Sequence, residues 1–206
     1  SDFLTHEDRT FLNSNQFIEL ALNGIRFSDL KEEIISKDIS IITGAAGTGK
    51  SEILKKLYLE SETKYLLNIN QVPSNTDIAI PIFIRLRECI NGNLEDLLRN
   101  RLKDFDVNVT NSRNQYSYFF DGLDEISAID FEGVVTCLMR LRSKPTTRAL
   151  VLTSRTNTSN LTTVLRDFRP EIYVIDALES GDVDAYFERI TIQEKHKKYM
   201  ELKNSN

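Results

Sequence analysis

The stretch that decides the fold reads Ile39-Ser40-Ile41-Ile42-Thr43-Gly44-Ala45-Ala46-Gly47-Thr48-Gly49-Lys50-Ser51. Its first five residues are rich in β-branched side chains, which is typical of a strand. Its last eight residues fit the pattern Gly-x-x-x-x-Gly-Lys-Ser. From Gly49 to Leu59 the apolar residues recur at helical spacing. A glycine loop between a strand and a helix offers backbone N–H groups and a positive helix end to an anion, so the stretch predicts a phosphate-binding loop.

Each residue type in this loop has a physical reason. Glycine permits positive φ angles and lets the backbone approach an anion, and alanine keeps the loop free of bulky side chains. The ammonium of Lys50 supplies a charge for the outer phosphates, and the hydroxyl of Ser51 is a ligand for Mg²⁺. We therefore expect the phosphates of ATP or a related nucleotide to bind to Gly44, Ala45, Ala46, Gly47, Thr48, Gly49, Lys50 and Ser51.

A cluster of acidic residues follows the apolar, aromatic-rich strand predicted over 115–120. Asp121 stands at the strand end, where a carboxylate can hold Mg²⁺ through its water shell. Asp124 and Glu125 can orient or deprotonate an attacking water, and either of them fits the role of base. An Asp-Gly pair after a strand is by itself often a plain turn. Because the cluster follows a phosphate loop by about seventy residues, it indicates nucleotide hydrolysis.

The remaining segments alternate between strands and helices. We predict helices over 9–22, 28–35 (with Ser28 as N-cap), 93–103, 127–142, 161–168 and 180–190, strands over 65–69, 80–87, 149–153 and 172–175, and a loop over 72–77. Such alternation predicts an α/β fold of the P-loop NTPase type, a three-layer sandwich in which a mostly parallel sheet of about five strands carries helices on both faces. The glycine loop is then expected at the carboxyl edge of the sheet.

Composition excludes several classes of protein. The net charge of −5 argues against direct nucleic-acid binding. The apolar runs are too short to span a membrane, and the N-terminus does not resemble a signal peptide, so we expect a cytoplasmic location. Cys89 and Cys137 are expected to be reduced and buried, and two cysteines with two distant histidines do not predict a zinc site.

Four segments in family order resemble NACHT domains, which belong to the STAND class of signal-transducing P-loop ATPases related to AAA+ proteins. The most specific is the acidic segment Phe119-Phe120-Asp121-Gly122-Leu123-Asp124-Glu125. The glycine loop followed by Glu52, the segment over 80–88 and the segment Leu150-Val151-Leu152-Thr153-Ser154-Arg155 are similar to the corresponding parts of that family. The resemblance covers roughly residues 39–178.

The resemblance implies roles for individual residues. Asp121 would support Mg²⁺, and Asp124 and Glu125 would serve hydrolysis. Arg155 matches the sensor arginine that approaches the γ-phosphate, although a solvated arginine at a strand end is the alternative.

Glu52 and Arg87 match family positions near the nucleotide. Arg87 alternates with apolar residues, so it equally fits the wetter face of a peripheral strand. Ile25 and Phe27 precede the core, where this class packs on the base, but ordinary core packing is the more common role of such residues.

The resemblance also implies a function. We expect an ATP/ADP-binding, Mg²⁺-dependent module that acts as a nucleotide-controlled switch in a larger signalling or defence protein. A constitutive AAA+-like ATPase is the alternative, and a P-loop kinase is disfavoured because no arginine-rich lid is evident.

The resemblance further implies a division of the chain and a set of partners. We expect an N-terminal helical segment over 1–38, the NACHT-like domain over 39–190 and a polar tail, or the start of a helical domain, over 191–206. Because NACHT proteins continue into helical and winged-helix domains, partners would be other domains of a longer parent protein, and copies of the chain on activation.

Overall fold

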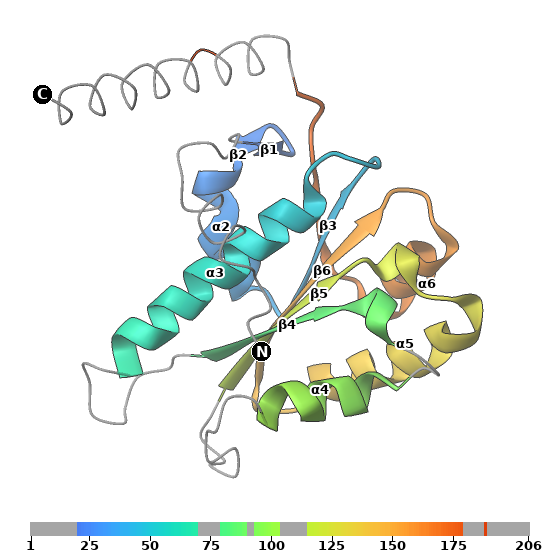
Figure 1. Cartoon of the computed structure of the whole chain (residues 1–206). Helices are drawn as coiled ribbons and strands as arrows, with labels where there is room; N and C mark the ends of the chain where they lie inside the picture. The colour runs from blue at the N-terminus through green and yellow to red at the C-terminus, as the bar shows by residue number, and fades with distance from the viewer. Residues whose placement is uncertain (1–19, 70–78, 90–92, 104–114, 179–187, 189–206) are drawn as a thin grey trace, which may run out of the picture.

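The computed structural model describes residues 20–69, 79–89, 93–103, 115–178 and 188. Its elements, shown in Figure 1, are β1 (Ala21–Leu22), β2 (Ile25–Arg26), α2 (Phe27–Ser36), β3 (Ile39–Gly44), α3 (Lys50–Ile69), β4 (Ala79–Arg85), the 3₁₀ helix η1 (Leu86–Glu88), α4 (Leu94–Lys103), β5 (Gln115–Asp121), the 3₁₀ helix η2 (Leu123–Glu125), α5 (Ala128–Arg142), β6 (Thr147–Arg155), α6 (Ser159–Phe168) and β7 (Glu171–Val174). None of the described helices is long and apolar enough to cross a membrane.

The central sheet has five strands in the order β4-β5-β6-β3-β7. Each neighbouring pair is parallel, which confirms the predicted fold class. Strand β6 lies between β3, which leads into the glycine loop, and β5, which ends in the acidic cluster. In register, Gly44 pairs with Arg155, and Arg85 pairs with Asp121. The ends of four strands therefore bring the predicted site residues to one edge of the sheet.

Two hydrophobic cores lie on opposite faces of this sheet, with α2 and α3 on one side and α4, α5 and α6 on the other (Figure 1). Strand β3 serves both cores, because Ile41 faces one and Ile42 the other. On the α3 side, the ring of Tyr58 meets Phe83 and Phe119 edge-on, with ring centroids 5.6 and 5.9 Å apart. Burial on both faces explains why the strands are nearly continuous apolar runs.

The strand predicted over 65–69 is wrong, because α3 continues through it to Ile69. The run Tyr65-Leu66-Leu67 is short and apolar, and such a run does not distinguish a strand from a helix by periodicity. No glycine or proline interrupts the helix, and the hydroxyls of Ser61 and Thr63 donate to the carbonyls of Leu57 and Leu59 four residues earlier. Helix α3 thus extends well beyond Leu59.

The helix predicted over 9–22 is wrong in its described part. Residues 20–22 lead into β1, which pairs with β2 in an antiparallel hairpin, and residues 9–19 lie outside the described residues. The turn residues Asn23 and Gly24 have φ angles of 53° and 77°. Two positive φ angles in an Asn-Gly pair are typical of the tight turn that joins hairpin strands. The pair closes a hairpin rather than ending a helix.

Smaller differences concern the ends of elements. Helix α2 begins one residue earlier than expected, and its N-cap is Arg26 rather than Ser28, with no side-chain cap hydrogen bond. Strand β4 ends at Arg85, so the predicted alternation does not reach Arg87, which lies in η1. The loop predicted over 72–77 lies outside the described residues, and so does the helix over 180–190 except for Glu188, which is helical.

Candidate functional site

The glycine loop follows β3 directly and leads into α3 at Lys50. Gly47 and Gly49 have φ angles of 77° and 90°, a conformation that side chains other than glycine rarely adopt. At Gly44 the constraint is space, because a Cβ atom there would lie 2.6 Å from Oγ1 of Thr48. The Thr48 hydroxyl donates to the carbonyl of Ala45 at 3.0 Å, which ties the loop across itself. Ala45 and Ala46 are exposed.

Lys50 folds back over this loop. Its ammonium Nζ donates to the carbonyls of Gly44 and Ala45, at 3.1 and 2.6 Å. Burial lowers the pKa of Lys50, and the nearby carboxylate of Asp124 opposes that shift. The charge of Lys50 is thus partly desolvated at the loop, where its hydrogen-bond acceptors among the described residues are two neutral carbonyls.

One oxygen of Asp121 joins strands β5 and β6 and the first turn of α3. Oδ1 accepts a hydrogen bond from Ser51 Oγ at 2.9 Å and another from Thr153 Oγ1 at 2.6 Å. Thr153 lies on β6 between the two site strands, is only 1 % exposed, and accepts the backbone N–H of Gly122 at 2.8 Å. Thr153 therefore orients the carboxylate of Asp121 and anchors the turn that follows it.

The turn after Asp121 requires glycine. Gly122 has a φ angle of 81°, and a Cβ atom there would lie 3.0 Å from Cδ of Glu125. The short helix η2 that follows is held by Asn160 of α6, whose amide donates to the carbonyls of Leu123 and Ile126 at 3.1 and 3.3 Å. This turn brings Asp124 and Glu125 to the edge of the sheet on a supported element.

Asp124 and Glu125 have different surroundings. Oδ1 of Asp124 accepts the backbone N–H of Arg155 at 2.9 Å, and Oδ2 lies 3.0 Å from Nε of the same arginine. The side chain of Asp124 is 9 % exposed, whereas Glu125 is an exposed residue. Both oxygens of Asp124 are therefore engaged by Arg155, and Glu125 faces solvent.

Other predicted site residues lie at the periphery. Glu52 is in the first turn of α3, where its carboxylate accepts from Lys55 at 2.9 Å. Arg87 is exposed on η1, which contacts η2. Phe27 is 1 % exposed inside the core, in agreement with ordinary packing, and Ile25 is 48 % exposed on the hairpin.

Two groups beside the loop were not predicted. A Cβ atom at Gly49 would lie 2.9 Å from Cδ1 of Leu20, and one at Gly44 would lie 3.4 Å from Cβ of Ile175. The backbone N–H of Ile175 donates to Thr43 at 2.8 Å. These apolar contacts join segments far apart in the chain, so no local pattern indicates them. The role of Thr153 could have been predicted from the sequence, since a hydroxyl group inside a buried strand needs a hydrogen-bond partner.

The residues present fit a magnesium ion bound together with a nucleotide. Among the residues described, no cluster of three or more His, Cys, Asp or Glu side chains is arranged to hold a metal by itself. Mg²⁺ at a nucleotide site takes one or two protein ligands and completes its shell with phosphates and water. The adjacent oxygens of Ser51 and Asp121 match that need.

Among solved structures, the similarity to one protein supports the fold. The crystal structure of Saccharomyces cerevisiae RIF2 is similar with a TM-score of 0.53 and 16% identity, over 79% of this chain and 59% of that one. The AMPPCP-bound DnaA of Aquifex aeolicus gives a TM-score of 0.45 and 16% identity, over 82% of this chain and 49% of that one. The chain thus spans about half to three fifths of these proteins. No curated protein matches its sequence.

Comparison with protein families gives a more specific result. The family model for the NACHT domain matches residues 38–194, which is more than half of the chain and includes the glycine loop, the acidic cluster and Arg155. The sequence resemblance and this match agree on the same segments. The chain belongs to the NACHT domain family and is a nucleotide-binding module of the STAND class of P-loop NTPases.

Proposed function

We propose that this chain is an ATP/ADP-binding, Mg²⁺-dependent NTPase module whose nucleotide state acts as a switch within a larger signalling or defence protein. The observation that carries the proposal is the 2.9 Å hydrogen bond between Ser51 and Asp121. It joins the start of the phosphate-loop helix to the acidic strand end. Nucleotide and metal sites of P-loop proteins need this pairing of a hydroxyl and a carboxylate.

Binding would use groups that are already positioned. The ammonium of Lys50 would exchange two loop carbonyls for the outer phosphates, whose charge it complements. Backbone N–H groups of the loop from Gly44 to Gly49 would cradle the inner phosphates. When bound, Mg²⁺ neutralises phosphate charge, and Ser51 and Asp121 would hold it.

We assign the role of general base to Glu125. Both carboxylate oxygens of Asp124 are occupied by Arg155, so neither is directed at an attacking water. Glu125 is exposed and stands one residue further along the same short helix. Asp124 would then position Arg155, the proposed contact to the γ-phosphate.

Hydrolysis by the isolated chain should be slow. The side chain of Arg155 is 57 % exposed and paired with Asp124, so it is not committed to a phosphate. A P-loop GTPase that lacks its arginine finger turns over on the order of 10⁻⁴ per second. Slow turnover suits a switch, because the bound nucleotide then persists long enough to define a state.

The test is phosphate release by the purified chain with Mg²⁺ and ATP, compared with Glu125→Gln and Asp124→Asn. We expect slow release in the wild type, and in Glu125→Gln a further loss of at least tenfold with unchanged nucleotide affinity. Release at several per second that Glu125→Gln abolishes would instead identify a constitutive AAA+-like ATPase. An unaltered rate in Glu125→Gln together with loss in Asp124→Asn would move the base to Asp124.

The biological setting is also a proposal. We propose a cytoplasmic parent protein in which residues 1–38 lead into the NTPase domain over 39–190, and residues 191–206 form a tail or begin a helical domain. Further domains of that parent, and copies of the chain on activation, would be its protein partners, with no membrane or direct nucleic-acid contact.

A further inference from the structure

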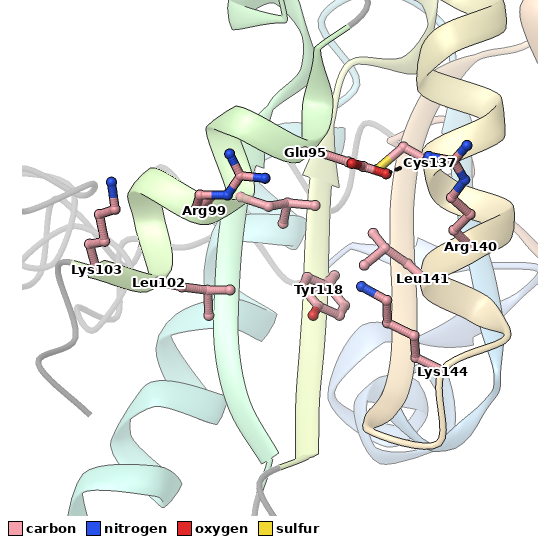
Figure 2. Close-up of a pocket in the computed structure, with 10 residues that line it drawn as sticks. Glu95, Arg99, Leu102, Lys103, Tyr118, Cys137, Arg140, Leu141 and Lys144 are labelled. Carbon is pink, nitrogen blue, oxygen red and sulfur yellow. Dashed lines mark hydrogen bonds and ion pairs between the residues drawn. The ribbon is translucent and has the colours of Figure 1, made fainter. Parts of the chain in front are cut away.

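A second cavity lies away from the glycine loop, between α4 and α5 on the other face of the sheet. It has a volume of about 400 Å³, which is within the range of pockets that bind small organic molecules. Figure 2 shows that its side chains come from both helices and that Tyr118 of β5 lies between them. The lining is therefore built from three elements of the folded core.

The inner part of the cavity is apolar. Leu98 and Leu102 of α4 line it together with Cys137 and Leu141 of α5. Tyr118 lies between the two helices and forms the base (Figure 2). The Tyr118 side chain is 4 % exposed and stacks on Phe120, with ring centroids 5.9 Å apart. Stacking and burial fix the position of this base, so an apolar group entering the cavity would meet a preformed surface.

The outer part of the cavity is cationic. Four basic side chains line it, namely Arg99, Lys103, Arg140 and Lys144, together with the single carboxylate of Glu95. Glu95 accepts from Arg140 at 2.8 Å, and Arg99 pairs with Asp96 at 3.0 Å. Within the described part of the chain, Lys103 and Lys144 form no ion pair. Figure 2 shows the ammonium of Lys144 turned toward the space between the two helices, whereas that of Lys103 points away from this space at the far end of α4. Lys144 is therefore the lysine that a ligand in the cavity would meet.

The ion pair between Glu95 and Arg140 limits the length of a ligand that can bind in the cavity. The two residues also line a neighbouring hollow that contains Asn93, Ile129, Glu132 and Thr136. The pair spans the space between α4 and α5 where the two hollows meet (Figure 2). A continuous peptide helix along both hollows would have to break it, whereas a short ligand would not.

We propose that this cavity is a binding site for a small amphipathic anion, with an apolar chain or ring between Leu98, Leu102, Leu141 and Tyr118 and a carboxylate or phosphate at Lys144. The site is separate from the nucleotide site and needs no covalent step. An apolar base with a cationic rim selects a ligand that is apolar at one end and negatively charged at the other.

The test uses octanoate as the probe and follows backbone amide shifts of the full chain by NMR below the micellar concentration of the probe. We expect saturable shifts in α4 and α5. The variant Lys144→Glu should weaken binding at least tenfold, because it reverses the charge that meets the anion on an exposed side chain. Lys103→Glu, whose side chain points away from the cavity, should weaken binding much less. Leu102→Gln should weaken binding through the apolar part.

Three controls separate this site from general charge and hydrophobic effects. Lys37→Glu changes an exposed lysine outside the cavity and should bind octanoate like the wild type. Octylamine and 1-octanol have the same chain without the negative charge and should bind at least tenfold more weakly. The proposal is overturned by the absence of saturable shifts, by shifts confined to the glycine loop, or by unchanged affinity in the folded Lys144→Glu variant.

Discussion

At the scale of single residues, the nucleotide site depends on one carboxylate oxygen that two hydroxyl groups share. Ser51 and Thr153 both donate to Oδ1 of Asp121. In the proposed site, Oδ2 would be left to a metal-bound water. Thr153 also accepts the N–H of Gly122. A single buried hydroxyl thus orients the proposed metal ligand and the turn that leads to Glu125.

The variant Thr153→Val should lower nucleotide affinity about tenfold in the presence of Mg²⁺ and much less in its absence. It keeps the shape of the side chain but removes both hydrogen bonds, and a buried N–H without a partner costs about 1–3 kcal/mol of stability. Titration of nucleotide with and without Mg²⁺ measures the difference. Thr153→Ser should retain most of the affinity. An equal loss with and without the metal would mean that Thr153 only supports the fold.

The pKa of Lys50 gives a prediction about pH. Burial lowers the pKa of Lys50 in the folded state from its usual 10.5. At pH values between the lowered pKa of the folded state and the usual pKa of the unfolded state, the unfolded state therefore binds more protons. Stability should therefore rise with pH across that interval. Nucleotide affinity should fall over the same interval, because phosphates need the charged form. Affinity measured against pH should begin to decline below 10.5, and a decline only above that value would contradict the partial desolvation of Lys50.

At the scale of elements, the hairpin of β1 and β2 protects the open edge of the sheet beside the glycine loop. Asn23 at its turn donates from Nδ2 to the carbonyl of Ile172 at 3.1 Å and accepts the N–H of Val174 at 3.0 Å. Gly24 donates to Asp176 at 2.7 Å. The unpaired groups of edge strand β7 are thus satisfied by a turn rather than by another strand.

The variant Asn23→Gly should lower the free energy of unfolding by about 1–2 kcal/mol. Glycine accepts the positive φ angle at this position, so the change isolates the two side-chain hydrogen bonds. Urea denaturation measures this loss of stability. The free energy of unfolding of Asn23→Asp should lie between those of the wild type and Asn23→Gly, because aspartate keeps the acceptor and loses the donor. Stability equal to the wild type would show that the hairpin does not depend on this contact.

The sequence predicted most elements of the sheet, and it failed where local patterns are ambiguous. Strands β3 and β5 are largely apolar; β3 ends at Gly44, and β5 ends at Asp121 immediately before Gly122, so their positions were predictable. Residues 65–69 are equally apolar but extend α3, because tertiary packing and the absence of a helix breaker decide the outcome. The Asn-Gly pair is typical of a hairpin turn. The same pair also fits the end of a helix, and the sequence prediction used that second interpretation.

At the scale of the whole molecule, the strand order brings the site together. Inserting β6 between β3 and β5 places Thr153 beside Asp121, and Arg155 beside Asp124. The motifs predicted which residue types serve the site. They did not predict Thr153, or that Arg155 binds Asp124, because those contacts follow from the order of strands, which is set by packing between segments far apart in the chain.

The reactivity of the two cysteines measures how readily the hydrophobic core that contains them opens to solvent. Cys89 and Cys137 are buried in the same core, and burial raises the pKa of each thiol to about 11. Near pH 8 the thiolate fraction is then about a hundredfold below that of an ordinary cysteine. A thiol reagent should react at least that much more slowly in the folded chain, and at the normal rate in urea. Rapid reaction of either thiol without urea would mean that this core opens readily.

The central claim is that the glycine loop holds the phosphates of a nucleotide. Calorimetric titration of ATP and ADP with Mg²⁺ into the wild type and into Lys50→Ala tests it most directly, with circular dichroism to show that both proteins are folded. We predict micromolar binding to the wild type and a loss of at least a hundredfold in Lys50→Ala, because the substitution removes the cation that meets the outer phosphates. Equal affinity in the two folded proteins would contradict the account.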